Sequence, residues 1–237
     1  MKITLLASGS SGNAYKVNTG ETTLLIECGL PYKKLQEKLK YKMTELDACL
    51  VTHEHMDHAK ASQKLIENGI DLYMTNGTAE ALNLNGHRLH TFSKNSIGYE
   101  PKEIKDTTVI AFKAVHDVRE PVNFYIKDNT TNEKVVFITD TAYILYKIPP
   151  VDYLMIECNY VQSIIDEEVQ NGKIHLDLRN RIVKNHLSLE RLLDFFKNYN
   201  LSKTKAIYLL HLSSNNSDQK MIYNAVAKAT GKQIYFS

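Results

Sequence analysis

The stretch Thr52-His53-Glu54-His55-Met56-Asp57-His58 follows directly on the apolar run Asp47-Ala48-Cys49-Leu50-Val51. Such a run is typical of a buried strand, and a tight loop at a strand's end holds its side chains in fixed directions. Imidazole and carboxylate groups suit zinc, manganese or iron. Within six residues stand four candidate metal ligands: His53, His55, Asp57 and His58. One metal would not use all four beside the ligands found elsewhere in the chain, so the stretch predicts two.

The composition is that of an ordinary soluble globular protein, with 43% hydrophobic and 24% charged residues. A chain of 237 residues can form one large α/β domain, so we expect a single domain over residues 1–237. A net charge of +2 is too small to indicate a nucleic-acid scaffold, although it does not oppose a phosphate substrate.

The cysteines and the apolar runs bear on location. Cys28, Cys49 and Cys158 are odd in number and lie in apolar runs, which is typical of reduced core residues in an intracellular protein. The apolar run in residues 1–7 is too short for a signal peptide. No apolar run approaches the ~20 residues of a membrane span. We expect a cytoplasmic protein that does not enter a membrane.

Hydrophobic periodicity predicts alternating strands and helices along the chain. We expect strands at residues 2–7, 14–18, 22–28, 47–51, 107–115, 151–156 and 205–210. We expect helices at residues 59–68, 176–184 and 189–198, and Ser188 is suited to cap the last of these. Residues 83–106 give mixed signals.

Polar residues also stand just past the ends of other buried strands. They are His116, Asp140, Glu157 and His211. A single histidine at a strand end is more often capped or solvated than bound to metal. Several strand ends that each deliver His or Asp, beside the His53–His58 cluster, indicate one shared site.

The pattern His53-x-His55-x-Asp57-His58, followed by His116, Asp140 and His211, resembles the five-motif signature of the metallo-β-lactamase fold. The resemblance covers essentially the whole chain. It implies an α/β fold, the αβ/βα four-layer sandwich in which two mixed β-sheets are flanked by helices. In that family's pattern, His53, His55 and His116 would hold the first metal, Asp57, His58 and His211 the second, and Asp140 would bridge them.

The same resemblance implies two divalent metal ions, with Zn²⁺ as the first choice and Mn²⁺ as the alternative. Two such metals can share a hydroxide whose pKa is lowered towards ~7, so hydrolysis without a protein nucleophile is the expected chemistry. Asp57 therefore counts among the catalytic residues as well as the metal ligands. The sequence departs from the family's pattern at Glu27, where an aspartate usually follows the third strand. We expect Glu27 to brace the histidine loop.

Three later stretches resemble the ribonuclease-Z-type phosphodiesterases, in which a Glu and a His supply the acid for the leaving group. They are Leu154-Met155-Ile156-Glu157-Cys158-Asn159-Tyr160, Asn185-His186-Leu187-Ser188 and His211-Leu212-Ser213-Ser214-Asn215-Asn216. Carried over, Glu157 would orient and charge His186, which would protonate a departing alkoxide. The structural alternative for His186 is packing on the sheet. Ser213 and Asn215 are the expected substrate contacts.

The Gly9-Ser10-Ser11-Gly12-Asn13 start and the His116-Asp117 stretch with Glu120-Pro121-Val122 look most like the small YycJ (WalJ) branch, which is associated with nuclease activity. Phage-encoded relatives of the same build, the anti-Pycsar proteins, cleave cyclic mononucleotides. The sequence does not separate the two substrates, and the near-neutral charge gives weak weight to the small one. The ribonuclease-Z-like group also implies a homodimer.

We therefore predict a dinuclear metal-dependent phosphodiesterase that acts on a cyclic nucleotide or a nucleic-acid strand. The alternative enzyme is a carboxylic ester, lactone or thioester hydrolase, in which His186 would be idle. A binding protein with purely structural metals is a further alternative. The ligand set argues against it, because structural sites are usually closed and this set leaves a shared open position.

Overall fold

The computed structural model describes residues 1–96 and 98–236 of the chain. It divides into two compact units, the first made of residues 1–113 and 118–134 and the second of residues 114–117 and 135–236. The expected single domain over residues 1–237 stays a prediction. Among the described helices, none is long and apolar enough to cross a membrane.

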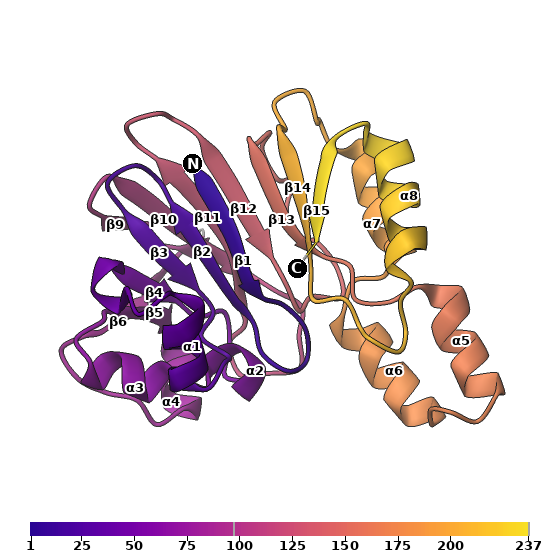
Figure 1. Ribbon diagram of the computed structural model, residues 1–237, viewed down its shortest axis with the longest axis horizontal. Coiled ribbons are helices and arrows are strands. Elements are labelled where there is room, and N and C mark those ends of the chain that lie inside the picture. The colour runs from indigo at the N-terminus through magenta and orange to yellow at the C-terminus, as the bar shows by residue number, and fades with distance from the viewer. Residues whose placement is uncertain (97, 237) are drawn as a thin grey trace. The chain divides into compact units, whose positions relative to one another are not determined.

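The first unit contains a six-stranded mixed sheet whose strands follow chain order (Figure 1). The first three strands are antiparallel and the last four are parallel, with the third strand in both groups. Every residue of the short fourth strand is buried, which is typical of a strand covered on both faces. The strands are β1 (Lys2–Ala7), β2 (Ala14–Asn18), β3 (Thr23–Ile26), β4 (Ala48–Leu50), β5 (Leu72–Thr75) and β6 (Leu89–Phe92).

Short helices connect the parallel strands of this sheet. They are α1 (Tyr32–Lys38), the 3-10 turn η1 (Met43–Glu45), α2 (Met56–Ala59), α3 (Ser62–Glu67) and α4 (Asn76–Ala81). Leu35 of α1 and Leu65 of α3 are buried in one hydrophobic core with Cys49 of β4. The predicted helix over residues 59–68 is wrong in extent, because α2 ends at Ala59 and α3 covers only Ser62–Glu67. Tertiary contacts hold the single turn of α2, whose exposed Met56 gives no apolar periodicity.

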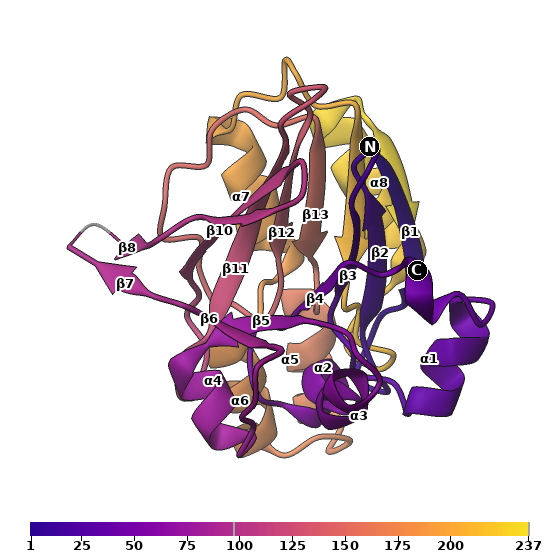
Figure 2. The same cartoon turned by 90° about the vertical axis from the view of Figure 1, so that its left-hand side faces the viewer.

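Three antiparallel strands complete the first unit: β9 (Lys102–Ile104), β10 (Thr107–Lys113) and β11 (Val122–Asp128). Buried and half-buried residues alternate along β10, as its sequence predicts. A hairpin of β7 (Lys94–Asn95) and β8 (Gly98–Tyr99) projects from this unit (Figure 2). Its residues Lys94 and Tyr99 both contact the carboxylate of Glu120. Strands β6 to β9 lie where the sequence gave mixed signals.

The second unit contains four parallel strands, β12 (Lys134–Ile138), β13 (Tyr153–Glu157), β14 (Ala206–Leu210) and β15 (Gln233–Phe236). Two helices, α7 (Leu189–Asn198) and α8 (Gln219–Thr230), pack beside each other next to these strands (Figure 1). Ser188 caps α7, since its side chain accepts a hydrogen bond from Arg191 N at 3.3 Å, which confirms the predicted cap. Helix α6 (Leu176–Asn185) was predicted, whereas α5 (Gln162–Gln170), which pairs with it, was not.

At Gly29, the segment that follows β3 lies directly against the Asp57–His58 turn of the histidine loop. A Cβ atom at Gly29 would lie 1.7 Å from the carbonyl oxygen of Asp57, and so could not be accommodated without a backbone shift. The neighbouring Cys28 N donates to the carbonyl of His58 at 2.8 Å. Asn13 N donates to the carbonyl of Asp57 at 2.7 Å. Only glycine therefore lets residues 28–29 lie directly against the Asp57–His58 turn.

Gly29→Ala should lower the free energy of unfolding by about 1–3 kcal/mol, because the new methyl group overpacks a site closed by backbone atoms. Chemical denaturation monitored by circular dichroism measures the change. Gly172→Ala is the control, because its added Cβ would meet no atom within 4 Å. Its only cost is that alanine disfavours the left-handed backbone conformation that glycine adopts there. Equal losses in the two variants would contradict the close-approach argument.

Candidate metal and catalytic site

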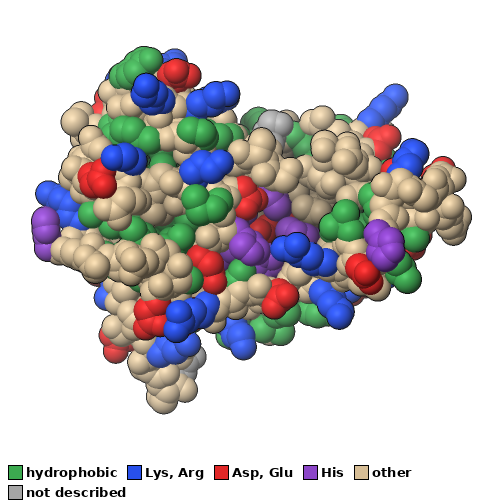
Figure 3. All heavy atoms as spheres, turned by 90° about the horizontal axis from the view of Figure 1, so that it is seen from below, with side chains coloured by type: hydrophobic (Ala, Val, Ile, Leu, Met, Phe, Trp, Pro, Cys, Tyr) green, Lys and Arg blue, Asp and Glu red, His purple; other side chains and the backbone are tan. Residues whose placement is uncertain are grey.

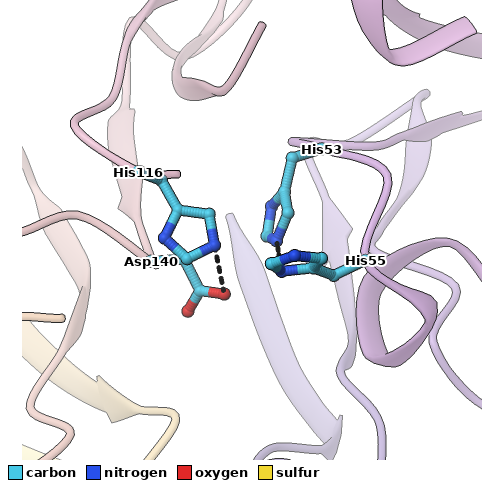
Figure 4. A group of neighbouring side chains, drawn as sticks. All are labelled: His53, His55, His116 and Asp140. Carbon is cyan, nitrogen blue, oxygen red and sulfur yellow. Dashed lines mark hydrogen bonds and ion pairs between the residues drawn. The ribbon is translucent and has the colours of Figure 1, made fainter. Parts of the chain in front are cut away.

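Three histidines of the first unit lie against one another just beyond β4. His53 Nε2 is 3.2 Å from His55 Nδ1, and the two rings turn towards each other in Figure 4. The rings of His53 and His58 are 4.2 Å apart between centroids. Asp57 Oδ2 lies 3.4 Å from His58 Nε2. Two nitrogens on one tetrahedral zinc ion are roughly 3.3 Å apart, given Zn–N bonds of about 2.0–2.1 Å, so the His53–His55 separation suits a shared metal.

Buried polar groups hold this loop in place. The Thr52 hydroxyl lies 2.8 Å from His53 Nδ1, and Thr52 N donates to Glu27 Oε1 at 3.3 Å. The fully buried Glu27 also places Oε2 3.5 Å from His58 Nδ1. A carboxylate behind a ligand histidine fixes the ring's tautomer and direction. The contacts of Glu27 are therefore those expected of a residue that braces the histidine loop.

Asn13 supports His58 from another side. Its side-chain amide donates to the carbonyl of Asp57 at 3.1 Å and lies 3.2 Å from His58 Nε2. Gly9 N and the Tyr15 hydroxyl both donate to Asn13 Oδ1, at 2.9 and 3.0 Å. The Gly9–Asn13 turn thus serves to position the histidine loop.

In the second unit, three acidic and histidine side chains meet at the ends of neighbouring strands. Asp140 follows β12, Glu157 ends β13 and His211 follows β14, and the strands are parallel neighbours. His211 Nδ1 is 3.0 Å from both Asp140 Oδ1 and Glu157 Oε1. Asp140 and His211 have φ values of 42° and 54°, a left-handed conformation that is rare for residues with a side chain. Such conformations concentrate at functional sites, where the surrounding structure enforces them.

His186 lies at the C-terminal end of α6 and points to the same carboxylates. Its Nδ1 is 2.8 Å from Glu157 Oε1 and 3.6 Å from Asp140 Oδ1. Burial alone lowers the pKa of His186, but the charge of Glu157 and a hydrogen bond with Asp140 outweigh this and raise the pKa to about 9. Its side chain keeps 18% of its surface exposed. The carboxylates of Glu157 and Asp140 thus favour the protonated form of the His186 ring, and solvent can reach that ring.

His116 lies beside Asp140, with its Nε2 3.9 Å from Asp140 Oδ2 (Figure 4). Its Nδ1 lies 3.2 Å from the carbonyl oxygen of Asn185. The Asn185 side chain in turn accepts a hydrogen bond from Asp117 N at 2.9 Å. The residue before His186 thus positions His116.

The donor set of the second unit fits a divalent metal ion. One side-chain atom from each of its members lies within 4.8 Å of the others: Asp140, Glu157, His186 and His211. A histidine that turns one ring nitrogen to a carboxylate presents the other to a metal, which is the arrangement of His211. Imidazole and carboxylate donors together suit zinc or manganese. The structure gathers His53, His55, Asp57 and His58 in the first unit, and it places His116 and His211 each beside Asp140 in the second. Their service as ligands of two metals stays a prediction.

The predicted substrate contacts have mixed surroundings. The Ser213 hydroxyl oxygen accepts hydrogen bonds from Asn215 N at 3.4 Å and Asn216 N at 3.2 Å. Ser213 thus organises the turn after His211, while Asn215 is exposed. Substrate contact by Ser213 and Asn215 stays a prediction.

Sequence reasoning missed three polar residues that position ligands. Besides Thr52 and Asn185, Asn159 donates its side-chain amide to the carbonyl of His211 at 2.9 Å. Thr52 and Asn185 are sequence neighbours of His53 and His186, which is the one signal that could have indicated them.

Figure 3 shows basic and acidic side chains interspersed over the surface in view. Among the residues described, Lys and Arg alternate there with acidic side chains, and histidines are visible on the same face.

Solved structures with similar folds agree with this architecture. The metallo-β-lactamase fold protein YhfI of Bacillus subtilis aligns with a TM-score of 0.75 and 17% identity, over 99% of this chain and 95% of that chain. Human tRNase Z, short form, aligns with a TM-score of 0.66 and 15% identity, over 100% and 96% of the two chains. At these identities the likeness shows the fold alone. The fold is the metallo-β-lactamase fold, with mixed β-sheets and flanking helices, as the sequence predicted.

Residues 22–211 match the family model described as a beta-lactamase superfamily domain. The exodeoxyribonuclease WalJ of Streptococcus pneumoniae is 30% identical over 94% of this chain and 85% of its own length. The exodeoxyribonuclease YycJ of Bacillus anthracis is 28% identical over 96% and 88%. The chain therefore belongs to the beta-lactamase superfamily, in its WalJ/YycJ branch. It is an enzyme, a metal-dependent hydrolase.

Glu157→Gln should lower the pKa of His186 from about 9, because the substitution removes the negative charge that favours the protonated ring. An NMR titration of the histidine side chains in metal-free protein would measure the change. His175, whose side chain is 81% exposed, is the internal control and should not differ between the two proteins. An unchanged pKa of His186 would show that Glu157 does not favour the protonated form of this ring.

Proposed function

We propose that this chain is a metal-dependent phosphodiesterase that hydrolyses nucleotide phosphodiesters, with a nucleic-acid strand ahead of a cyclic nucleotide as the substrate. The observation that carries the proposal is the 2.8 Å contact between His186 Nδ1 and Glu157 Oε1, beside the metal-type donors Asp140 and His211. The choice of a nucleic-acid strand is supported by the relatives named as exodeoxyribonucleases.

We further propose that two divalent metal ions, Zn²⁺ first and Mn²⁺ as the alternative, are held by the ligand set that the family pattern assigns. When bound, such ions supply an activated water and neutralise the charge that develops on the phosphate. The ligands would be His53, His55, Asp57, His58, His116, Asp140 and His211. The support is the donor chemistry of each cluster, together with the family pattern.

The chain's own contribution to bond cleavage is the proton of His186. The oxygen that leaves a phosphodiester is a poor leaving group as an alkoxide, so it needs a proton as the P–O bond breaks. The carboxylates of Glu157 and Asp140 raise the pKa of His186 to about 9 and so favour the protonated ring. Glu157 fixes the ring through Nδ1, which presents Nε2–H as the donor. Leu187 N also donates to Glu157, at 3.0 Å, so the same carboxylate holds the backbone that carries His186.

Two broader expectations belong to the same proposal. We propose a cytoplasmic location, which is supported by the buried cysteines Cys28, Cys49 and Cys158, all of them free thiols. We also propose a homodimer on the basis of the ribonuclease-Z-like resemblance. Light scattering of the purified protein would decide the latter.

His186→Ala should slow the hydrolysis of phosphodiesters with alkoxide leaving groups by ~10²–10⁴-fold, the usual contribution of a general acid. It should hardly affect a nitrophenolate ester, because nitrophenolate leaves without a proton. Steady-state kinetics on a dinucleotide and on bis(p-nitrophenyl) phosphate measure the two effects. His175→Ala, which removes an exposed histidine of the same unit, is the matched control. An equal loss on both substrates would reject the acid role.

Asp57→Ala should abolish turnover and lower the metal content, because it removes a predicted metal ligand. The fold should persist, because the Asp57 side chain is only partly buried.

A mass-spectrometric panel would test the substrate class with metal-loaded wild type and this variant. It would contain end-labelled single-stranded DNA and RNA, 3′,5′-cyclic mononucleotides, cyclic dinucleotides, a lactone and a thioester. Strand trimming supports the nuclease proposal, cyclic nucleotide opening alone would select the smaller substrate, and turnover of only the lactone or thioester would overturn the phosphodiesterase.

A further inference from the structure

The second unit contains a cavity of about 910 Å³, and the metal-type donors and His186 do not line it. It lies between the loop of residues 142–150 and one face of α7. Its volume falls within the range of pockets that bind small organic ligands, about 300–1,000 Å³. Its wall is rich in aromatic side chains, Tyr143, Tyr146, Phe195 and Tyr199. Such walls usually bind flat, partly apolar groups.

Helix α7 turns one apolar face to the core and a second, mixed face to the cavity. Leu189, Leu192 and Phe196 are buried, and these positions pack against the unit's interior. The cavity is lined instead by positions 187, 190, 191, 194, 195, 198 and 199, whose spacing of three and four places them on a second face. On that face Phe195 and Tyr199 are stacked, with centroids 4.9 Å apart.

The loop of residues 142–150 forms the opposite wall of the cavity. Hydrogen bonds tie this loop to Arg191 at one end and to Tyr199 at the other. At one end Arg191 donates to the carbonyl of Ala142 at 3.1 Å and lies over the Tyr143 ring, 4.6 Å from its centroid. At the other end the Tyr199 hydroxyl donates to the carbonyl of Pro149, and Val151 N donates to that hydroxyl, each at 3.0 Å. The loop is thus pinned while Tyr143 keeps 53% of its surface exposed.

The cavity begins beside the catalytic residues of the same unit. Ala142 is two residues beyond Asp140, and Leu187 directly follows His186. Leu187 N also donates to Glu157, so one carboxylate holds both the acid and the first residue of the cavity wall. A group that occupies the cavity would therefore contact residues within two positions of Asp140 and His186 in the chain. This points to the leaving-group side of the substrate.

The charges of the wall favour an uncharged occupant. Among the described lining residues, Lys147 and Arg191 are cations and Glu190 and Asp194 are acids, so the charges balance. A track for a nucleic-acid backbone is strongly positive, because it must neutralise phosphates. Nucleobases stack on exposed tyrosine rings and hydrogen-bond to carboxylates and amides, and Asn198 and Asn200 add amides to this wall.

We propose that this cavity binds the nucleobase and sugar of the leaving-group nucleotide, with the base stacked on the Tyr143 ring. The assignment rests on the proposed phosphodiesterase function. It makes Arg191 a positioning residue, since the guanidinium holds the Tyr143 ring and the Ala142 backbone together. The enzyme then requires a base on the leaving side of the scissile bond.

Fluorescence of 2-aminopurine deoxynucleoside 5′-monophosphate tests the stacking directly, because stacking quenches this base and the chain has no tryptophan to interfere. Wild type should quench the probe, Tyr143→Ala should weaken its binding by ~10-fold or more, and Tyr143→Phe should restore it. Tyr223→Ala, which removes a 44%-exposed tyrosine of α8 that does not line the cavity, is the matched control. Equal binding by all four proteins would overturn the proposal.

Kinetics separate this proposal from the proposed function. The two substrates are a dinucleotide and the same compound with an abasic sugar on the leaving side. Wild type should prefer the dinucleotide through a lower KM, and Tyr143→Ala should reduce that preference ~10-fold. Turnover of both compounds with no preference would overturn the nucleobase site while leaving the phosphodiesterase intact. A dimer-to-monomer change in Tyr143→Ala without a change in probe binding would show that a second copy occupies the cavity, and would also overturn it.

Discussion

The buried carboxylate of Glu157 is the constraint on which the second unit's site depends. It is fully shielded from water at the end of β13, where an unpaired charge would be very costly. The contacts that compensate this charge come from His186 Nδ1, His211 Nδ1 and Leu187 N. Each contact also sets the direction of a group that the chemistry needs. Satisfying one buried charge therefore aligns His211, the proposed proton donor His186 and the backbone segment that carries it.

Strand geometry brings these groups to one place. Because β12, β13 and β14 are parallel neighbours, their carboxyl ends share an edge, and residues 17 and 54 positions apart become adjacent. The left-handed backbone at Asp140 and His211 then turns the chain sharply at that edge. Glu27, with φ 64°, does the same at the end of β3 in the other unit. In each unit, local strain sits where a polar side chain must leave a buried strand.

How far the sequence could predict this follows from the same physics. Apolar runs that stop at His53, Asp140 or His211 identify both the strands and the site, since burial and polarity change at one residue. Helix α5 was missed because only Ile165 of its nine residues is buried, so its apolar periodicity is weak. The turn α2 was missed because Met56 points to solvent. Asn159 acts through a contact with His211, which is distant in sequence, and no local pattern encodes that contact.

The two faces of α7 keep the packing of the core separate from the proposed recognition of the base. Its inner face stabilises the fold through Leu189, Leu192 and Phe196, whereas its outer face and the 142–150 loop carry little of the buried core. Substitutions on the outer side can therefore accumulate at small cost in stability and without touching the proton donor. A lineage that carries this scaffold could change its preferred substrate through a series of folded, active intermediates. Diversification of this kind needs no insertion of a new domain.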